Sequence, residues 1–165
     1  MKKYNKLFLF IVLSLVFTIT GCTQASTEND ISEDVQKIIE TFMTAPNPDL
    51  YSPEMTTYVG LDAEPTEEEK AATKAKSEEI TANWEATLGD CFDENGVTTF
   101  LNSGPALYYL VREQEVEVVN MELVDKVYSY EIVQVTAQID GAEEEVQLLF
   151  KRNPNGKIWF VEFYE

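Results

Sequence analysis

The C-terminal region from Val127 to Tyr164 constrains the fold more strongly than any other part of the chain. It consists of three apolar-rich runs separated by the dipeptides Asp140-Gly141 and Asn155-Gly156. These dipeptides favour hairpin turns because glycine, asparagine and aspartate tolerate positive φ. In the first run, polar side chains alternate with apolar ones that share one face of an extended chain: Val133, Val135, Ala137 and Ile139. Alternation with a period of two indicates strands, so we expect a three-stranded antiparallel meander.

The segment 30–45 is expected to form a helix. Its apolar residues recur at helical spacing along one face: Ile31, Val35, Ile38, Ile39 and Phe42. Asp30 and Glu33 have the spacing of a capping box at the start of the segment, and Pro46 would end the helix. The apolar stripe predicts that this helix packs against a core.

A second, longer helix is expected over residues 66–88. Thr66 and Glu69 form another capping box, and Gly89 suits the left-handed conformation that ends many helices. The strong apolar spacing is confined to the second half of this segment: Ile80, Trp84 and Leu88. We therefore expect the C-terminal half of the helix to pack against the core and the N-terminal half to lie on the surface.

Two further strands are predicted before the meander, at residues 106–111 and 116–124. In the second of them Val118 and Val119 are adjacent apolar residues, which indicates a β-bulge at that point. Helices followed by a run of strands give an α+β order. The expected architecture is a set of N-terminal helices packed on a curved antiparallel sheet of about five strands.

The first 21 residues have the pattern of a secretory signal peptide. A lysine-rich start precedes an apolar run over residues 7–20, which at 14 residues is too short to span a bilayer comfortably. The run ends in Ile19-Thr20-Gly21-Cys22, which resembles the lipobox of bacterial lipoproteins. The resemblance implies that Cys22 carries a diacylglyceryl group on its sulfur and becomes the first mature residue. The alternative is ordinary secretion with cleavage a few residues later, near Ala25.

The lipobox predicts how the chain is divided. Residues 1–21 would be the lipoprotein signal peptide, residues 22–29 a lipidated tether, and residues 30–165 one α+β domain. Two or more acyl chains hold a protein stably on a membrane. We therefore expect the domain to be anchored at the outer, extracytoplasmic face of the cell membrane.

The strong negative charge limits the classes of partner. The net charge is −18, and removal of residues 1–21, which contain three lysines and no acid, would make it −21. Nucleic acid and anionic lipid surfaces would repel such a protein, so neither is expected as a binding partner. With Cys22 lipidated, Cys91 is the only remaining thiol. No internal disulfide is then expected, and Cys91 is expected to be buried.

The order of elements over residues 31–164 resembles the nuclear transport factor 2-like, or cystatin-like, cone domain. The ending Asn155-Gly156-Lys157-Ile158-Trp159-Phe160-Val161 is similar to the last hairpin of small lipoproteins of Gram-positive type in that superfamily. The resemblance implies a curved sheet that wraps the N-terminal helices and leaves a pocket between helices and sheet. Because the superfamily includes isomerases, dehydratases and non-catalytic binding or assembly domains, the fold does not select a function.

The absence of histidine restricts the chemistry that the chain can perform. It removes the commonest general base and the commonest transition-metal ligand. Residues 91–102 match an EF-hand loop only in part, because Cys91 and Asn102 occupy positions that require acids. No catalytic residue, metal site or cofactor is therefore expected. Carboxylate and tyrosine chemistry stays open, with one of three acids (Asp125, Glu131 or Glu162) opposite one of three tyrosines (Tyr108, Tyr128 or Tyr130).

Aromatic residues supply the remaining candidates for a binding site. Four of them are predicted to line a pocket between helix and sheet: Trp84, Tyr108, Tyr128 and Tyr130. The last strand, at residues 158–164, is apolar on both faces, which indicates an interface across the sheet. The candidate interface residues are Trp159, Val161 and Phe163, and a second copy of the chain is one partner that they suggest.

Together these patterns favour a lipid-anchored protein that acts as a binding or interaction module for a small ligand or another envelope protein. Two alternatives stay open. One is a carboxylate-and-tyrosine enzyme of the ketosteroid-isomerase or dehydratase kind. The other is a structural or assembly subunit of an envelope complex, which would form a homodimer or a larger complex through the sheet.

Overall fold

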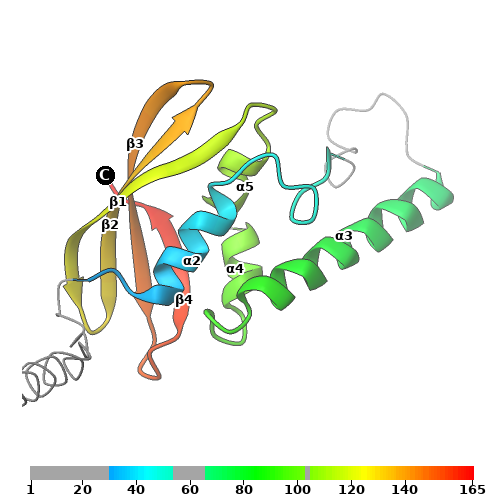
Figure 1. Ribbon diagram of the computed structural model, residues 1–165. Coiled ribbons are helices and arrows are strands. Elements are labelled where there is room, and N and C mark those ends of the chain that lie inside the picture. The colour runs from blue at the N-terminus through cyan, green and yellow to red at the C-terminus, as the bar shows by residue number, and fades with distance from the viewer. Residues whose placement is uncertain (1–29, 54–65, 103–104) are drawn as a thin grey trace, which may run out of the picture. The chain divides into compact units, whose positions relative to one another are not determined.

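The patterned C-terminal region forms antiparallel strands, as the sequence predicts. The computed structural model describes residues 30–53, 66–102 and 105–165. Its single sheet has the order β1-β2-β3-β4, in which every neighbouring pair is antiparallel (Figure 1). The strands are β1 (Val116–Val127), β2 (Tyr130–Ile139), β3 (Ala142–Arg152) and β4 (Ile158–Phe163). The α+β class is therefore confirmed.

Both glycine-containing turns lie where the sequence predicts them. Asp140 and Gly141 join β2 to β3 with φ values of 48° and 82°, a pair of positive angles that matches the right-handed twist of the flanking strands. Gly156 has a φ of 82° in the turn between β3 and β4. The turn between β1 and β2, at Tyr128 and Ser129, contains no glycine, asparagine or proline.

Two irregularities shape the edge strand β1. The pairing with β2 shifts between Val118 and Asn120 and again between Leu123 and Asp125, so that Val119 and Val124 are extra residues. The bulge predicted at Val118 and Val119 is confirmed, whereas the second bulge was not predicted. Each bulge strengthens the local twist of the strand.

The predicted strand at residues 106–111 is wrong, because this segment forms the helix α5 (Pro105–Leu110). Proline is well placed in the first turn of a helix, where its missing N–H group has no intrahelical partner. The buried residues of α5 recur at helical spacing: Pro105, Ala106, Tyr109 and Leu110. A second short helix, α4 (Gly96–Asn102), precedes it. The described sheet accordingly has four strands and not five.

The first helix, α2 (Glu33–Phe42), begins later than predicted. Its N-cap residue is Ser32, so the expected capping box of Asp30 and Glu33 is wrong. The apolar face is as predicted, because Val35, Ile38, Ile39 and Phe42 are all buried. Figure 1 shows α2 lying across one face of the sheet, with α4 and α5 beside it.

The second predicted helix, α3 (Glu67–Leu88), has the expected capping box. The Glu69 N–H donates to Thr66 Oγ1 at 3.3 Å, and the Thr66 N–H donates to Glu69 Oε2 at 2.7 Å. The buried residues are confined to the C-terminal half, as predicted: Ile80, Trp84 and Leu88. Gly89 has a right-handed φ of −53°, so the predicted left-handed cap is wrong.

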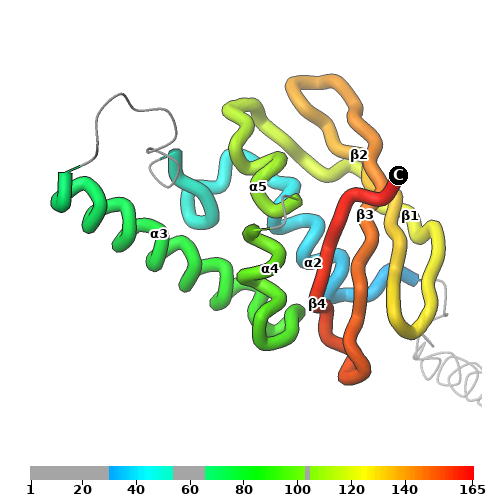
Figure 2. Tube along the Cα trace, turned by 180° about the vertical axis from the view of Figure 1, so that it is seen from behind, coloured from blue at the N-terminus to red at the C-terminus, as the bar shows by residue number. Residues whose placement is uncertain are grey.

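The core lies between the helices and one face of the sheet. The sheet contributes seven fully buried apolar side chains to it: Val133, Val135, Ala137, Leu148, Phe150, Ile158 and Val161. Phe100 of α4 joins the layers, with its ring centroid 5.3 Å from that of Phe42 and 5.8 Å from that of Trp84. Figure 2 shows β4 beside α4 from the opposite side. Each of these large apolar side chains contributes about 1.5–3 kcal/mol of burial free energy.

In the part of the chain that the structure describes, no helix has both the length and the apolar content needed to cross a membrane.

Candidate functional site

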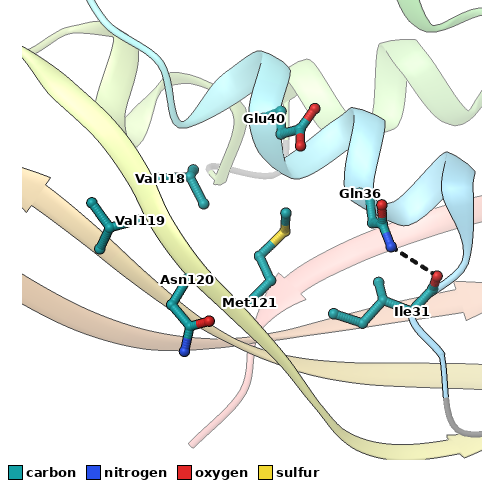
Figure 3. Close-up of a pocket in the computed structure, with 7 residues that line it drawn as sticks. All are labelled: Ile31, Gln36, Glu40, Val118, Val119, Asn120 and Met121. Atoms are coloured by element: carbon teal, nitrogen blue, oxygen red, sulfur yellow. Dashed lines mark hydrogen bonds between the residues drawn. The ribbon is translucent and has the colours of Figure 1, made fainter.

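A groove separates α2 and the residues just before it from the edge strand β1. Its volume is about 300 Å³. We call it the α2–β1 groove, and it is lined by Ile31, Gln36, Glu40, Val118, Val119, Asn120 and Met121. Figure 3 shows Val118 and Met121 reaching from β1 toward α2, while Gln36 donates through Nε2 to the Ile31 carbonyl oxygen at 3.0 Å. The charged residue among the lining side chains is Glu40, which is exposed.

The backbone of β1 is open along the side that faces this groove. β1 is an outer strand of the sheet, and one residue of it, Val116, pairs outward. Val116 and Ala45 exchange two backbone hydrogen bonds, at 3.0 and 3.1 Å. Beyond that bridge, none of the described residues supplies a backbone partner to the outer edge from Glu117 to Asp125. Such an edge is a template for another strand.

The exposed side chains of β1 are of two kinds. The bulge residues Val119 and Val124 are 46% and 50% exposed. The exposed charged residues of the strand are all acidic: Glu117, Glu122 and Asp125. The one basic residue, Lys126, is half-buried and directed inward, with Nζ 3.0 Å from Ser32 Oγ and 3.6 Å from Glu131 Oε2. The open edge is therefore apolar and acidic.

A second hollow, of about 410 Å³, lies where the end of β4 meets β3 and α5. We call it the aromatic hollow, and it is lined by Tyr108, Glu145, Val146, Gln147, Phe163, Tyr164 and Glu165. The rings of Tyr108 and Phe163 meet edge to face with centroids 5.2 Å apart. A cation already lies over Tyr108, because the Arg112 guanidinium carbon is 4.7 Å from the ring centroid.

The four predicted pocket residues do not converge. Trp84 is fully buried in the core, where Nε1 donates to the Leu50 carbonyl oxygen at 2.9 Å. Tyr108 lines the aromatic hollow. Tyr128 is 74% exposed in the turn between β1 and β2, and Tyr130 lies on the sheet face that the helices leave uncovered. The four side chains come from α3, α5, the β1–β2 turn and β2, a separation that periodicity alone cannot reveal.

The three predicted interface residues also separate. The pairing of β3 with β4 shifts after Lys151, and Trp159 is the extra residue on β4. The shift turns Val161 into the core, where it is fully buried, so Val161 is not part of an exposed surface. Trp159 and Phe163 are 43% and 38% exposed, but Phe163 belongs to the aromatic hollow. The strict alternation assumed for this strand is therefore wrong.

The three acids considered for catalysis each have a partner outside the two hollows. Tyr130 donates its hydroxyl to Asp125 Oδ2 at 2.7 Å on the solvent-exposed sheet face, and this hydrogen bond raises the pKa of Tyr130. Lys151 donates to Glu162 Oε1 at 2.7 Å. Glu131 is fully buried beneath the start of α2.

Glu131 belongs to a buried ionic cluster that fixes α2 to the sheet. Its two carboxylate oxygens accept the backbone N–H and the hydroxyl of Ser32, both at 2.7 Å. Arg152 of β3 lies 3.4 Å from Glu131 Oε2 and donates twice to Asp34, at 2.7 and 2.8 Å. Burial alone would raise the pKa of Asp34, but the bonds from Arg152 outweigh it and lower the pKa below 3.8.

The buried hydroxyl of Tyr109 in α5 is also paired within the protein. Burial, reinforced by the hydrogen bond to Glu144 Oε1 at 2.9 Å, raises the pKa of Tyr109.

Cys91 is buried, as predicted, and burial raises the pKa of its thiol. The predicted lipid site, Cys22, lies outside the described residues. Within those residues, no three histidine, cysteine or acidic side chains gather in a way that would hold a metal ion.

The sequence did not predict the α2–β1 groove, although one signal for it was present. The adjacent valines Val118 and Val119 indicated a bulge, and a bulged strand is often an edge strand.

Comparison of the chain with protein-family models, with curated proteins and with solved structures finds no match.

Proposed function

We propose that this protein is a lipid-anchored, extracytoplasmic protein that acts by binding and not by catalysis. The observation that carries the anchor is the sequence Ile19-Thr20-Gly21-Cys22 at the end of a lysine-headed apolar run. In this proposal Cys22 receives a diacylglyceryl group on its sulfur, and the chain is cleaved before Cys22. The acyl chains then hold the protein at the outer face of the cell membrane.

The proposal of a binding role is supported by the chemistry of the two hollows. The chain has no histidine, and the carboxylates that line the hollows (Glu40, Glu145 and Glu165) are exposed to water. A general base or acid is usually activated by removal from water or by a close charged partner. The fully buried acid, Glu131, is committed to Ser32 and Arg152.

We also propose that residues 31–165 are a reduced form of the nuclear transport factor 2-like cone. Support comes from the order of the elements, with helices before an antiparallel meander, and from α2 lying across one face of the sheet (Figure 1). The four strands described are fewer than the five expected of such a domain. The proposal concerns architecture and does not select a ligand.

The anchor is tested by replacing each cysteine in turn. Cys22→Ala is expected to abolish incorporation of labelled palmitate and to release the protein from the membrane fraction. Cys91→Ala is the matched control, because the chain has two cysteines and Cys91 is buried in the domain. Retention of Cys22→Ala on the membrane, or loss of label in Cys91→Ala alone, would contradict the proposed anchor.

The binding role is tested by photo-crosslinking in intact cells. A photoreactive amino acid is placed at one exposed position at a time: Val119 beside the α2–β1 groove, Tyr108 in the aromatic hollow, and Val111 as a position outside both. A discrete crosslinked product from at least one of the first two positions is expected. If no position gives a product while the protein stays on the membrane, the proposed binding role fails.

A further inference from the structure

We propose that the open edge of β1 beside the α2–β1 groove binds an extended, lysine- or arginine-rich segment of a partner protein. The segment would add to the sheet as a fifth strand. This inference rests on the proposed binding function and names the surface, the mode of binding and the chemistry of the partner.

The backbone supplies the first argument. An added strand gains its affinity chiefly from main-chain hydrogen bonds to an edge strand whose outward N–H and C=O groups are unpaired. The outer edge of β1 has one bridge, to Ala45, and from Glu117 to Asp125 no described residue supplies another backbone partner. Between the two bulges, the residues from Asn120 to Leu123 pair with β2 in regular register, so the backbone groups on the outer edge of this stretch keep the spacing that a neighbouring strand needs.

The groove supplies the second argument. Side chains of a strand point alternately to the two faces of its sheet. In a strand added beside β1, every second side chain would therefore point to the face covered by α2 and enter the α2–β1 groove. Ile31, Val118 and Met121 give the groove an apolar lining, so short apolar side chains fit there.

Charge selects the partner. The exposed charged side chains at the groove and along the open edge are acidic: Glu40 of α2, and Glu117, Glu122 and Asp125 of β1. A basic segment would be attracted and oriented by them, whereas like charges placed opposite each other in neighbouring strands are destabilising. A second copy of this chain would set β1 against β1 and bring these acids together. A basic segment of another protein is thus the favoured occupant.

The probe for the test is a fluorescent peptide of about seven alternating lysine and valine residues, long enough to cover the regular part of β1. Its binding to the full chain in neutral detergent is followed by fluorescence anisotropy. The control peptide has the same sequence with N-methyl groups on alternate residues, which removes backbone donors and keeps the charge. We expect the first peptide to bind and the control to bind at least about tenfold more weakly.

Two pairs of variants locate the site. Val119→Lys at the edge is matched by Val111→Lys outside it, since the two valines are 46% and 47% exposed. Glu40→Lys in the groove is matched by Glu94→Lys, in the turn before α4. We expect Val119→Lys and Glu40→Lys to weaken binding about tenfold or more, and the two controls to change it less than about twofold.

Each result supports or overturns the assignment. Equal binding of the N-methylated peptide, or equal loss in all four variants, would show that charge alone attracts the probe and would overturn it. The assignment would also be overturned if light scattering showed a dimer of the full chain that Val119→Lys dissociates, because a second copy of the chain would then occupy the edge. Failure of the anchor would leave the detergent assay unchanged. A crosslink from Tyr108 but not from Val119 would overturn the edge site and leave the binding role standing.

Discussion

Replacement of Glu131 tests how α2 is held on the sheet. The carboxylate is fully buried, accepts two hydrogen bonds of 2.7 Å from Ser32, and lies 3.4 Å from Arg152 and 3.6 Å from Lys126. Glu131→Ala would leave those cations without their shared partner and the Ser32 N–H unsatisfied. Breaking a buried ion pair by removing one partner costs about 3–5 kcal/mol. That is a large part of the roughly 5–15 kcal/mol that stabilises a typical domain.

Glu131→Gln removes the charge of the side chain and keeps nearly the same size and shape. The amide keeps an oxygen that can accept one bond from Ser32, but it loses the attraction to Arg152 and Lys126. We expect it to lower the free energy of unfolding by about 1–3 kcal/mol, less than Glu131→Ala. Glu162→Gln is the matched control, because the side chains of Glu162 and its partner Lys151 are 41% and 35% exposed. This change should lower the free energy of unfolding by less than about 1 kcal/mol.

Urea unfolding followed by tryptophan fluorescence measures these differences, since Trp84 is fully buried and becomes exposed to water on unfolding. With a slope of about 2 kcal/mol per molar urea, a loss of about 4 kcal/mol lowers the midpoint by about 2 M. If Glu131→Ala costs no more than Glu162→Gln, the ionic cluster does not hold α2 to the sheet and the reasoning is refuted.

Three further changes are expected to affect stability. Gly96→Ala would place a Cβ 2.7 Å from Phe92 Cβ, and should cost about 1–3 kcal/mol in urea unfolding; an unchanged midpoint would contradict this contact. Trp84→Phe leaves the buried Leu50 carbonyl without its donor and leaves a space in the core, so the free energy of unfolding, measured in urea by circular dichroism, should fall by about 2–4 kcal/mol; a change smaller than about 1 kcal/mol would argue against it. The pKa of Asp34 is lowered in the folded state, so the contribution of its carboxylate to stability is full above about pH 4 and is lost as the pH falls further. Asp34→Asn should therefore be less stable than the original protein near neutral pH and should lose less stability on acidification below about pH 4. If the stability of the variant and of the original protein fell in parallel with pH, this result would count against the ion pair.

The sheet could be predicted because its signals are local. Alternation and a glycine at a positive φ act within a few residues, so β2, β3 and the two turns that flank β3 were placed correctly. The turn at Tyr128 and Ser129 carries no such residue, and β1 was accordingly predicted to end at Val124 instead of Val127. Short apolar runs are ambiguous in the same way, which is why the segment that forms α5 was predicted as a strand.

The candidate site could not be predicted, because it depends on how elements meet. The α2–β1 groove requires that β1 be an edge strand, that α2 cross beside it, and that a bulge displace Val119. Strand order is a property of the whole sheet. A bulge on β4 similarly reversed the orientation of Val161, since one extra residue moves every later side chain to the other face.

The form of the β1 edge also argues for a selective site and not a merely unprotected one. Proteins commonly protect an edge strand with bulges, with lysine or proline, or by covering it. β1 has two bulges, but its outward-facing charges are all acidic and it contains no proline. Bulges limit the length of strand that can be added, to about the stretch from Asn120 to Leu123. Acidic side chains repel other copies of an acidic chain yet admit a basic segment. We therefore expect an edge built in this way to disfavour self-association by charge and to leave a short stretch open to a partner of the opposite sign.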